Sequence, residues 1–400
     1  MNNETRKETQ VLPKDVRYVG ADDLTLPLFE NQYPVQPMGV SYNSYLILDE
    51  KIAVMDSVDA RAADEWLAKL AHKLDGRSPD YLVISHMEPD HSGSILRLAE
   101  KYQEMQLVGN AKTFAMLRQF FGADAPSNDR LLEVGEGGTI SLGTHTLHFM
   151  LAPMVHWPEV MVAYEETEKL LFSADAFGRF GALSRTAAAP WAPQARRYYY
   201  NIVGKYGAQV QALLKKASAL EIKTVCPLHG PVLTGGALAE ALRLYDLWSR
   251  WQSEAPEEIL LAHASIHGNT ARAAELLKQK LEAKGARVTL CDLTTTEVSY
   301  AVANAFYCGK LVLACSTYDG GLFPPMEEFL SHLQAKGFRD RSVGLMENGS
   351  WAPAAARLMR AKLEEMKDLR VCGTVVSLRS ALSPASEAQM DALTTELCAE

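Results

Sequence analysis

Residues 81–91 read Tyr-Leu-Val-Ile-Ser-His-Met-Glu-Pro-Asp-His, and this stretch decides the fold of the first half of the chain. The apolar run 81–85 predicts a buried strand. The polar residues just past its end, His86, Glu88, Asp90 and His91, are all of metal-binding type. Leaving four such groups buried and unpaired would be costly. The stretch therefore predicts a metal site beyond the carboxyl end of a strand.

Three further points in the first half repeat this local form. The apolar runs 147–151, 170–173 and 222–226 are followed by His156, Asp175 and His229. Reactive residues are usually placed on loops that a rigid scaffold holds, so we expect the four loops to meet at a shared rim. Together they offer four imidazoles and three carboxylates, enough for two metal ions held close together.

The remaining histidines that we considered are interpreted as structural. A lone histidine at a strand end is more often a hydrogen-bonded packing residue than a ligand. This interpretation applies to His72, His145, His148, His263 and His332.

The donor types favour iron. Zinc sites prefer nitrogen and sulfur donors at low coordination number, whereas mixed imidazole and carboxylate sites with open positions suit iron that handles oxygen. The run from His86 to His91 resembles the metallo-β-lactamase superfamily, whose zinc members have His-x-His-x-Asp-His, but Glu88 replaces the second imidazole. Zinc and manganese stay open as alternatives.

Taken together, these motifs make the chain similar to the flavodiiron proteins (A-type flavoproteins, or rubredoxin:oxygen and nitric oxide oxidoreductases). The family signature His-x-Glu-x-Asp-His stands at 86–91, and the later ligands match His156 in 153–158, Asp175 in 172–178 and His229 in 227–230. Segments 39–47 and 196–201 also look like family segments. The resemblance covers nearly the whole chain after about residue 15.

The resemblance implies a role for each ligand. His86, Glu88 and His156 would hold one iron, Asp90 and His229 the other, and Asp175 would bridge the two. His91 would join the second iron, although family members do not always use this histidine. Beside the ligands, we expect Tyr198, Tyr199 or Tyr200 to place a hydroxyl near the metals and stabilise a bound oxygen species, with packing as the alternative role for each of them.

The second half alternates strand and helix patterns. Apolar runs at 259–264, 288–291, 310–315, 342–346 and 371–376 are separated by helical stretches, the first from 269 to about 284. Five such units predict a doubly wound parallel sheet of the flavodoxin type. The expected fold is α/β: a metallo-β-lactamase-like αββα sandwich over 1–252, followed by a flavodoxin-like domain over 257–400, with the boundary in the polar segment 249–258.

Three loops beyond the strands of this sheet have the chemistry to bind a flavin mononucleotide. The first would surround the phosphate with hydroxyls and helix N-terminal amides, the second offers paired glycines, and the third offers an indole beside the ring. Since no Gly-x-Gly-x-x-Gly follows the first strand, the mononucleotide FMN is favoured over a dinucleotide. The candidate contacts are Ser265, Ile266, His267, Gly268, Asn269, Thr270, Ser316, Thr317, Tyr318, Asp319, Gly320, Gly321, Asn348, Gly349, Ser350 and Trp351.

Composition restricts partners and location. A net charge of −9 without a basic stripe argues against nucleic acid. No apolar window is long enough for a membrane span, and residues 1–14 lack a signal-peptide core, so we expect a cytoplasmic protein. The six cysteines form no Cys-x-x-Cys pair and are expected to be reduced thiols, which excludes a fused rubredoxin centre from these residues.

The resemblance implies reduction of dioxygen to water, of nitric oxide to nitrous oxide, or both. Electrons would come from an external carrier such as rubredoxin and pass through FMN. A head-to-tail homodimer, or a dimer of such dimers, would bring each flavin beside the partner's metals. Two alternatives stay open: a metallo-β-lactamase-type hydrolase that uses a metal-activated hydroxide and carries an appended flavin domain, and a non-catalytic redox sensor or electron carrier.

Overall fold

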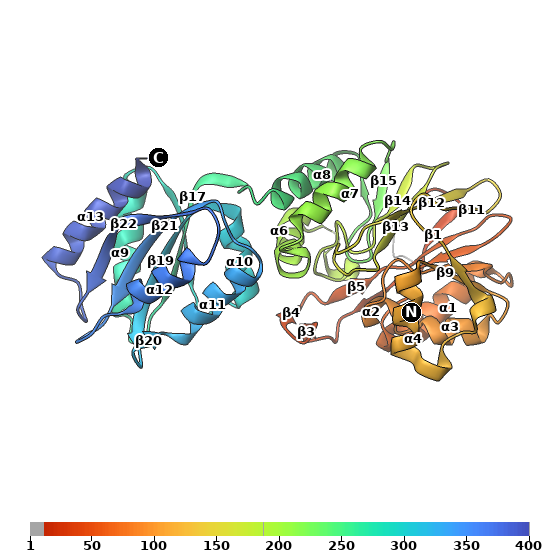
Figure 1. Cartoon of the computed structure of the whole chain (residues 1–400), viewed down its shortest axis with the longest axis horizontal. Coiled ribbons are helices and arrows are strands. Elements are labelled where there is room, and N and C mark those ends of the chain that lie inside the picture. Colours follow the sequence, from red (N-terminus) through yellow and green to blue (C-terminus); the bar gives the residue numbers. More distant parts are fainter. Residues whose placement is uncertain (1–11, 187, 400) are drawn as a thin grey trace, which may run out of the picture. The chain divides into compact units, whose positions relative to one another are not determined.

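The computed structural model describes residues 12–186 and 188–399 and divides the chain into two compact units, Met1–Asp246 and Leu247–Glu400 (Figure 1). The division falls a few residues before the polar segment 249–258, where the sequence predicts the boundary.

The first unit is built on two six-stranded sheets. The strands of the first sheet, in spatial order, are β1 (Val16–Tyr18), β6 (Tyr45–Ile47), β7 (Ala53–Met55), β8 (Tyr81–Val83), β9 (Gln106–Gly109) and β10 (Leu131–Glu133). Those of the second are β11 (Thr139–Ser141), β12 (Thr146–Leu151), β13 (Met161–Glu165), β14 (Leu170–Phe172), β15 (Thr224–Cys226) and β16 (Leu233–Thr234). The four runs that precede the candidate ligands are therefore strands: β8 in the first sheet, and β12, β14 and β15 in the second.

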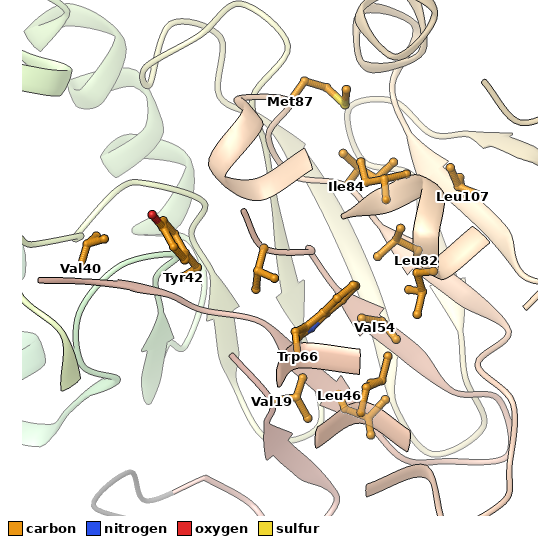
Figure 2. Close-up of a cluster of buried hydrophobic side chains, with 14 of the residues drawn as sticks. Val19, Val40, Tyr42, Leu46, Val54, Trp66, Leu82, Ile84, Met87 and Leu107 are labelled. Atoms are coloured by element: carbon orange, nitrogen blue, oxygen red, sulfur yellow. The ribbon is translucent and has the colours of Figure 1, made fainter. Parts of the chain in front are cut away.

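Alternation along the strands of the first sheet creates two cores, because successive side chains point to opposite faces. Tyr45, Met55 and Val83 face the second sheet and pack with Phe149 and Phe172. Their neighbours Leu46, Val54 and Leu82 face the other way, toward helices, where Trp66 of α1 is buried among them (Figure 2).

Helices cover the outer faces of both sheets. On the side of the first sheet lie α1 (Ala63–Leu74), α3 (Ile95–Lys101) and α4 (Ala111–Phe121). On the side of the second lie α7 (Gly207–Ala217) and α8 (Gly235–Ser249) (Figure 1). The unit is thus the predicted αββα sandwich.

The second unit has a six-stranded sheet, of which five strands are parallel and follow the flavodoxin order 2-1-3-4-5. The parallel strands, in spatial order, are β18 (Arg287–Asp292), β17 (Ala255–Ala264), β19 (Cys308–Tyr318), β21 (Arg341–Asn348) and β22 (Leu369–Leu378). The sixth, β20 (Gly321–Leu322), pairs antiparallel with β19. Helices α9 (Asn269–Ala283) and α13 (Pro384–Cys398) cover one face, and α10 (Val298–Tyr307), α11 (Pro324–Ala335) and α12 (Ala355–Glu364) cover the other (Figure 1). The predicted doubly wound sheet is confirmed.

Among the described helices, none combines the length and the apolar character that crossing a membrane requires.

Candidate metal centre and flavin cradle

All seven predicted ligand residues of the first unit meet in two adjoining groups. The first group contains His86, Glu88, His156 and Asp175, and the second contains Asp90, His91 and His229. Within each group the ligand atoms lie within 4.8 Å of one another. The strands themselves come from two sheets, so the site spans the edge of the sandwich rather than the rim of one sheet.

The first group surrounds a common point. Nε2 of His156 lies 3.1 Å from Oε2 of Glu88 and 3.0 Å from Oδ2 of Asp175. Nε2 of His86 lies 3.2 Å and 3.3 Å from the same two oxygens. Atoms bound to one ion at about 2.1 Å lie about 3 Å apart, so these four atoms have the spacing of ligands.

The second group has the same spacing. Nε2 of His91 and Nε2 of His229 are 3.1 Å apart, and Oδ2 of Asp90 lies 3.3 Å and 3.2 Å from them. Asp90 and His91 stand on the short helix α2 (Pro89–Ser92), which begins directly after Glu88. The helix thus directs Asp90 and His91 to the second group, whereas Glu88, just before it, belongs to the first.

Asp175 connects the two groups through its two oxygens. Oδ2 faces His86 and His156, while Oδ1 lies 3.3 Å from Nε2 of His91 and 3.6 Å from Nε2 of His229. The preceding residue, Ala174, has a left-handed φ of 51°, which turns the chain sharply after β14. The carboxylate is therefore placed where a bridging ligand would stand.

Two of the imidazoles are held by partners that the sequence did not reveal. Oε1 of Glu159 lies 2.7 Å from Nδ1 of His86 and also accepts a hydrogen bond from the backbone amide of Met87. Nδ1 of His229 donates to the backbone carbonyl of Ser41 at 2.6 Å. Such contacts fix the tautomer that leaves Nε2 free for a metal. No local pattern marks Glu159, because its partner His86 is 73 residues away in the sequence.

The electrostatics of the first group favour ion pairs. Burial lowers the pKa of His86, but its hydrogen bonds to Glu159 and Glu88 and the charge of Asp175 outweigh burial and raise that pKa well above its usual value. Burial likewise opposes the charged form of His156, yet the bonds to Asp175 and Glu88 raise its pKa to about 9. Burial raises the pKa of Asp175, but the neighbouring imidazoles of His91 and His156 hold that pKa well below its usual value. The imidazoles and carboxylates of this group therefore stabilise each other's charged forms, as a bound cation would stabilise the carboxylates.

Asp90 provides the test of whether a metal fits. Both of its carboxylate oxygens are buried and accept no hydrogen bond from the residues that the structure describes. A buried carboxylate without donors costs several kcal/mol, and a metal ion removes that cost. The residues present therefore fit a pair of metal ions.

Tyr198 lies beside the second group, whereas Tyr199 points elsewhere. The ring of Tyr198 is 5.5 Å from that of His229, and its buried hydroxyl has no hydrogen-bond partner among the described residues. Tyr199 packs against Tyr200 and Tyr245. The chain changes from α6 (Trp191–Tyr198) to a π-helical turn, η4 (Tyr199–Val203), at this point, and this change of pitch separates the two tyrosines. Phe29 also contacts His229, at 5.3 Å between ring centroids.

Several histidines that were interpreted as structural have ordinary partners. Nδ1 of His145 lies 3.0 Å from Glu165, and Nε2 of His148 lies 2.8 Å from Glu166. Neither belongs to the two groups. The six cysteines form no disulfide, and five of them are buried.

In the second unit, hydrogen bonds join the three predicted loops. Oγ1 of Thr270 lies 2.8 Å from Oγ of Ser316, and the side-chain amide of Asn348 donates to Thr270. Thr317 accepts from the backbone amides of residues 354 and 355. The loops that follow β17, β19 and β21 therefore form one cradle.

The surface of this cradle carries the expected side chains. Gly268, with a φ of 84°, precedes the first turn of α9, whose amides are open to an anion. Ile266, Tyr318 and Trp351 are exposed, Trp351 by 87%. An indole so exposed lacks a packing role within the unit.

A fourth loop, which the sequence did not indicate, closes the cradle. Ser380, after β22, donates its backbone amide to Asn348, accepts from the Asn348 amide, and shares a hydroxyl hydrogen bond with Ser350. It has a φ of 71°, a conformation rare for serine. Nothing in the local sequence marks this serine, because its partners are more than 25 residues away.

Comparisons with known proteins agree with this geometry. Residues 40–230 match the family model described as "ODP family beta lactamase". A nitric oxide reductase from Moorella thermoacetica is 27% identical over 362 residues, 88% of each chain. A rubredoxin-oxygen oxidoreductase from Megalodesulfovibrio gigas is 28% identical over 359 residues, 87% of each chain. The solved structure of the rubredoxin oxygen:oxidoreductase from Desulfovibrio gigas superposes with a TM-score of 0.90 at 24% identity and 98% coverage of both chains.

The fold and the two groups define a two-domain α/β protein, in which a metallo-β-lactamase-like sandwich with a dinuclear-type site precedes a flavodoxin-like domain. Within this class, relatives and structural neighbours of the chain include flavodiiron proteins, among them one from Giardia intestinalis with a TM-score of 0.86 at 24% identity. The resemblance that the motifs indicated is confirmed: the chain is a homologue of the flavodiiron oxidoreductases.

Proposed function

We propose that this protein is a flavodiiron oxidoreductase that reduces dioxygen to water, nitric oxide to nitrous oxide, or both. The observation that carries the proposal is the placement of Asp175, whose two oxygens face two separate groups of buried ligand atoms. A flavin-type cradle on the same chain and relatives named for these two reactions support it.

Each group would hold one iron. His86, Glu88 and His156 would bind the first ion, Asp90, His91 and His229 the second, and Asp175 would bridge them. Three carboxylates balance most of the charge of two divalent ions, which matters in a buried site.

FMN would bind in the cradle of the second unit, with its phosphate at the start of α9. When bound, the flavin supplies electrons singly or in pairs, and a ferrous pair supplies open coordination positions for the gas. Thr270, Ser316 and Asn348 hold the loops in place, and the exposed indole of Trp351 is available to flank the ring.

The residues around the ligands would control water and hydrogen bonding. Phe29 and Phe180 contact each other and Tyr198, forming an apolar wall beside His229. Burial, with the nearby Asp175, raises the pKa of Tyr198 well above its usual value, so its hydroxyl stays protonated and would be available as a hydrogen-bond donor beside the second group.

The electron donor, assembly and location are inferred from the same resemblance. We expect a small carrier such as rubredoxin, a cytoplasmic setting, and a head-to-tail homodimer or a dimer of such dimers in which each flavin serves the partner's metals. A monomer in solution that kept full turnover would contradict the dimer.

Anaerobic reduction followed by mixing with each gas tests the proposal. Iron and flavin are quantified first; the protein is then reduced and mixed with dioxygen or nitric oxide while flavin absorbance and gas concentration are followed. We expect flavin oxidation coupled to gas consumption. Flavin that is reduced and then stays reduced, with neither gas consumed, would indicate a sensor or carrier, and bound zinc without iron would favour the hydrolase.

A further inference from the structure

Residues 41–45, which run from β5 (Val40–Tyr42) into β6, lie against the loop 227–230 that carries His229. The two segments are more than 180 residues apart in sequence, yet side chains and backbone of the first bond repeatedly to the second. Asn43 stands at the centre of these bonds and is completely buried.

The side-chain amide of Asn43 donates two hydrogen bonds to this loop. Nδ2 donates to the carbonyl of Pro227 at 2.8 Å and to that of Gly230 at 2.7 Å, on either side of His229. Its backbone amide donates to the carbonyl of Leu228 at 2.8 Å. Oδ1 in turn accepts from the hydroxyl of Tyr18 at 3.0 Å, so the amide orientation satisfies every group.

Neighbouring residues reinforce the same loop. The hydroxyl of Tyr45 donates to the carbonyl of Pro227 at 2.9 Å, and the amide of Gly230 donates to Oγ of Ser41 at 2.8 Å. Gly230 has a φ of 79°, and a Cβ there would meet Cγ of Arg179 at 2.7 Å, so the loop has little freedom to adopt another path.

The loop is also tied to the proposed bridging residue. The amide of Leu228 donates to the carbonyl of Ala174, directly before Asp175. Asn43 thus reaches His229 of the second group through its own loop, and the loop of the bridging residue Asp175 through one further hydrogen bond. The first group has its own support in Glu159.

We infer that Asn43 is the positioning residue of the second metal site: its amide holds the His229 loop so that Nε2 faces Asp90, His91 and Asp175. The inference rests on the proposed diiron function and deepens it. The two carbonyls need a short side chain that carries two donors, as asparagine does. Aspartate has the same shape but offers only acceptors, so it cannot make either bond.

The test is ferrous-ion binding to the full-length protein without oxygen, measured by chelator competition for wild type and Asn43→Asp. We expect two tight ions per wild-type chain. In Asn43→Asp the second ion should bind about 10–100-fold more weakly, as for other supporting partners of metal ligands, while the first ion and the FMN content stay unchanged.

Tyr164→Phe is the matched control, because its hydroxyl donates to the carbonyl of Glu221 at 2.8 Å in the same unit without touching the ligand groups. It should lower the unfolding temperature of the metal-free protein but leave both affinities intact. Should Asn43→Asp not fold, Ser41→Ala and Tyr45→Phe each remove one bond to the loop and should weaken the second ion in the same direction.

The outcomes separate the two proposals. Wild type with two ions and variants with unchanged affinities, or with both ions weakened equally, would overturn the role of Asn43 and leave the diiron proposal standing. Wild type that binds fewer than two ions would overturn the diiron proposal and this inference with it.

Discussion

The carboxylate of Glu159 helps to hold one side of the candidate metal centre in place. Glu159 is buried and accepts from both the imidazole of His86 and the amide of Met87. Although burial opposes the charged form, the contact with His86 lowers the pKa of Glu159, so it is a carboxylate at neutral pH. A charged partner raises the basicity of a metal-bound imidazole.

Replacing Glu159 by glutamine keeps an acceptor but removes its charge. We expect the first ferrous ion to bind about tenfold more weakly, with the second ion unaffected, when affinities are measured by chelator competition. Glu166→Gln is the control, since Glu166 bonds only the exposed His148 in the described contacts. Equal affinities in Glu159→Gln and wild type would show that Glu159 has no part in holding the metal.

His263 makes the stability of the second unit depend on pH. It is buried on β17, and Asp292 lies 3.9 Å from its Nδ1, too far for a hydrogen bond. Burial lowers its pKa, which Asp292 and Glu275 offset only in part. The folded protein therefore holds neutral imidazole, while the unfolded chain takes up a proton near pH 6.5, so stability is full above that pH and falls as pH drops toward the folded pKa.

His263→Leu should reduce this loss. We expect the calorimetric unfolding temperature of the second unit to fall less between about pH 7.5 and about pH 5.5 than in wild type. The half-buried His332, whose pKa burial also lowers, retains part of the dependence. An identical fall in variant and wild type would contradict the assignment.

At the residue scale, the sequence indicates the candidate metal ligands better than the residues that hold them in place. The seven ligand residues carry recognisable side chains at strand ends, and all seven meet. Glu159, Ser41 and Asn43 are ordinary polar residues whose roles come from contacts with distant segments, which a single sequence does not display. Tyr198 and Tyr199 look equivalent in sequence, and only the π-helical turn distinguishes them.

At the element scale, the loops of the flavin cradle depend on one another. Asn348 at the end of β21 is buried and links Thr270 at the start of α9 to Ser380 after β22. Its side chain is thus occupied in joining loops, so its contribution to FMN binding would be preorganisation.

Asn348→Leu should therefore weaken FMN. Losing a buried hydrogen-bonding group costs about 1–3 kcal/mol, which corresponds to a roughly 5–150-fold rise in the dissociation constant measured by flavin fluorescence. Thr395→Val on α13 is the control, because it removes only an exposed bond to Asp391. Unchanged FMN affinity in Asn348→Leu would show that the loops are held without it.

Strand and helix patterns predicted the elements themselves well. The run 259–264 lies in β17, and the stretch 269–284 corresponds to α9 (Asn269–Ala283). The sequence did not indicate that β8 belongs to a different sheet from β12, β14 and β15, because periodicity describes a strand but not its pairing. The sequence also did not indicate the loop around Ser380, because the partners of this serine are distant in the sequence.

At the scale of the whole molecule, the two units supply complementary chemistry: buried ligands in one and a flavin-type cradle in the other. Each unit is compact and has its own hydrophobic core. The proposed reaction requires electrons to pass from the second to the first, within a chain or between the partners of a dimer.

Metal analysis combined with Mössbauer spectroscopy of iron-loaded, oxidised protein tests the central claim most directly. Because Asp175 faces both groups, we expect two irons per chain whose spins are coupled, giving a diamagnetic ground state, together with one FMN. A single iron, two magnetically independent irons, or zinc retained after loading under iron-replete conditions would contradict it.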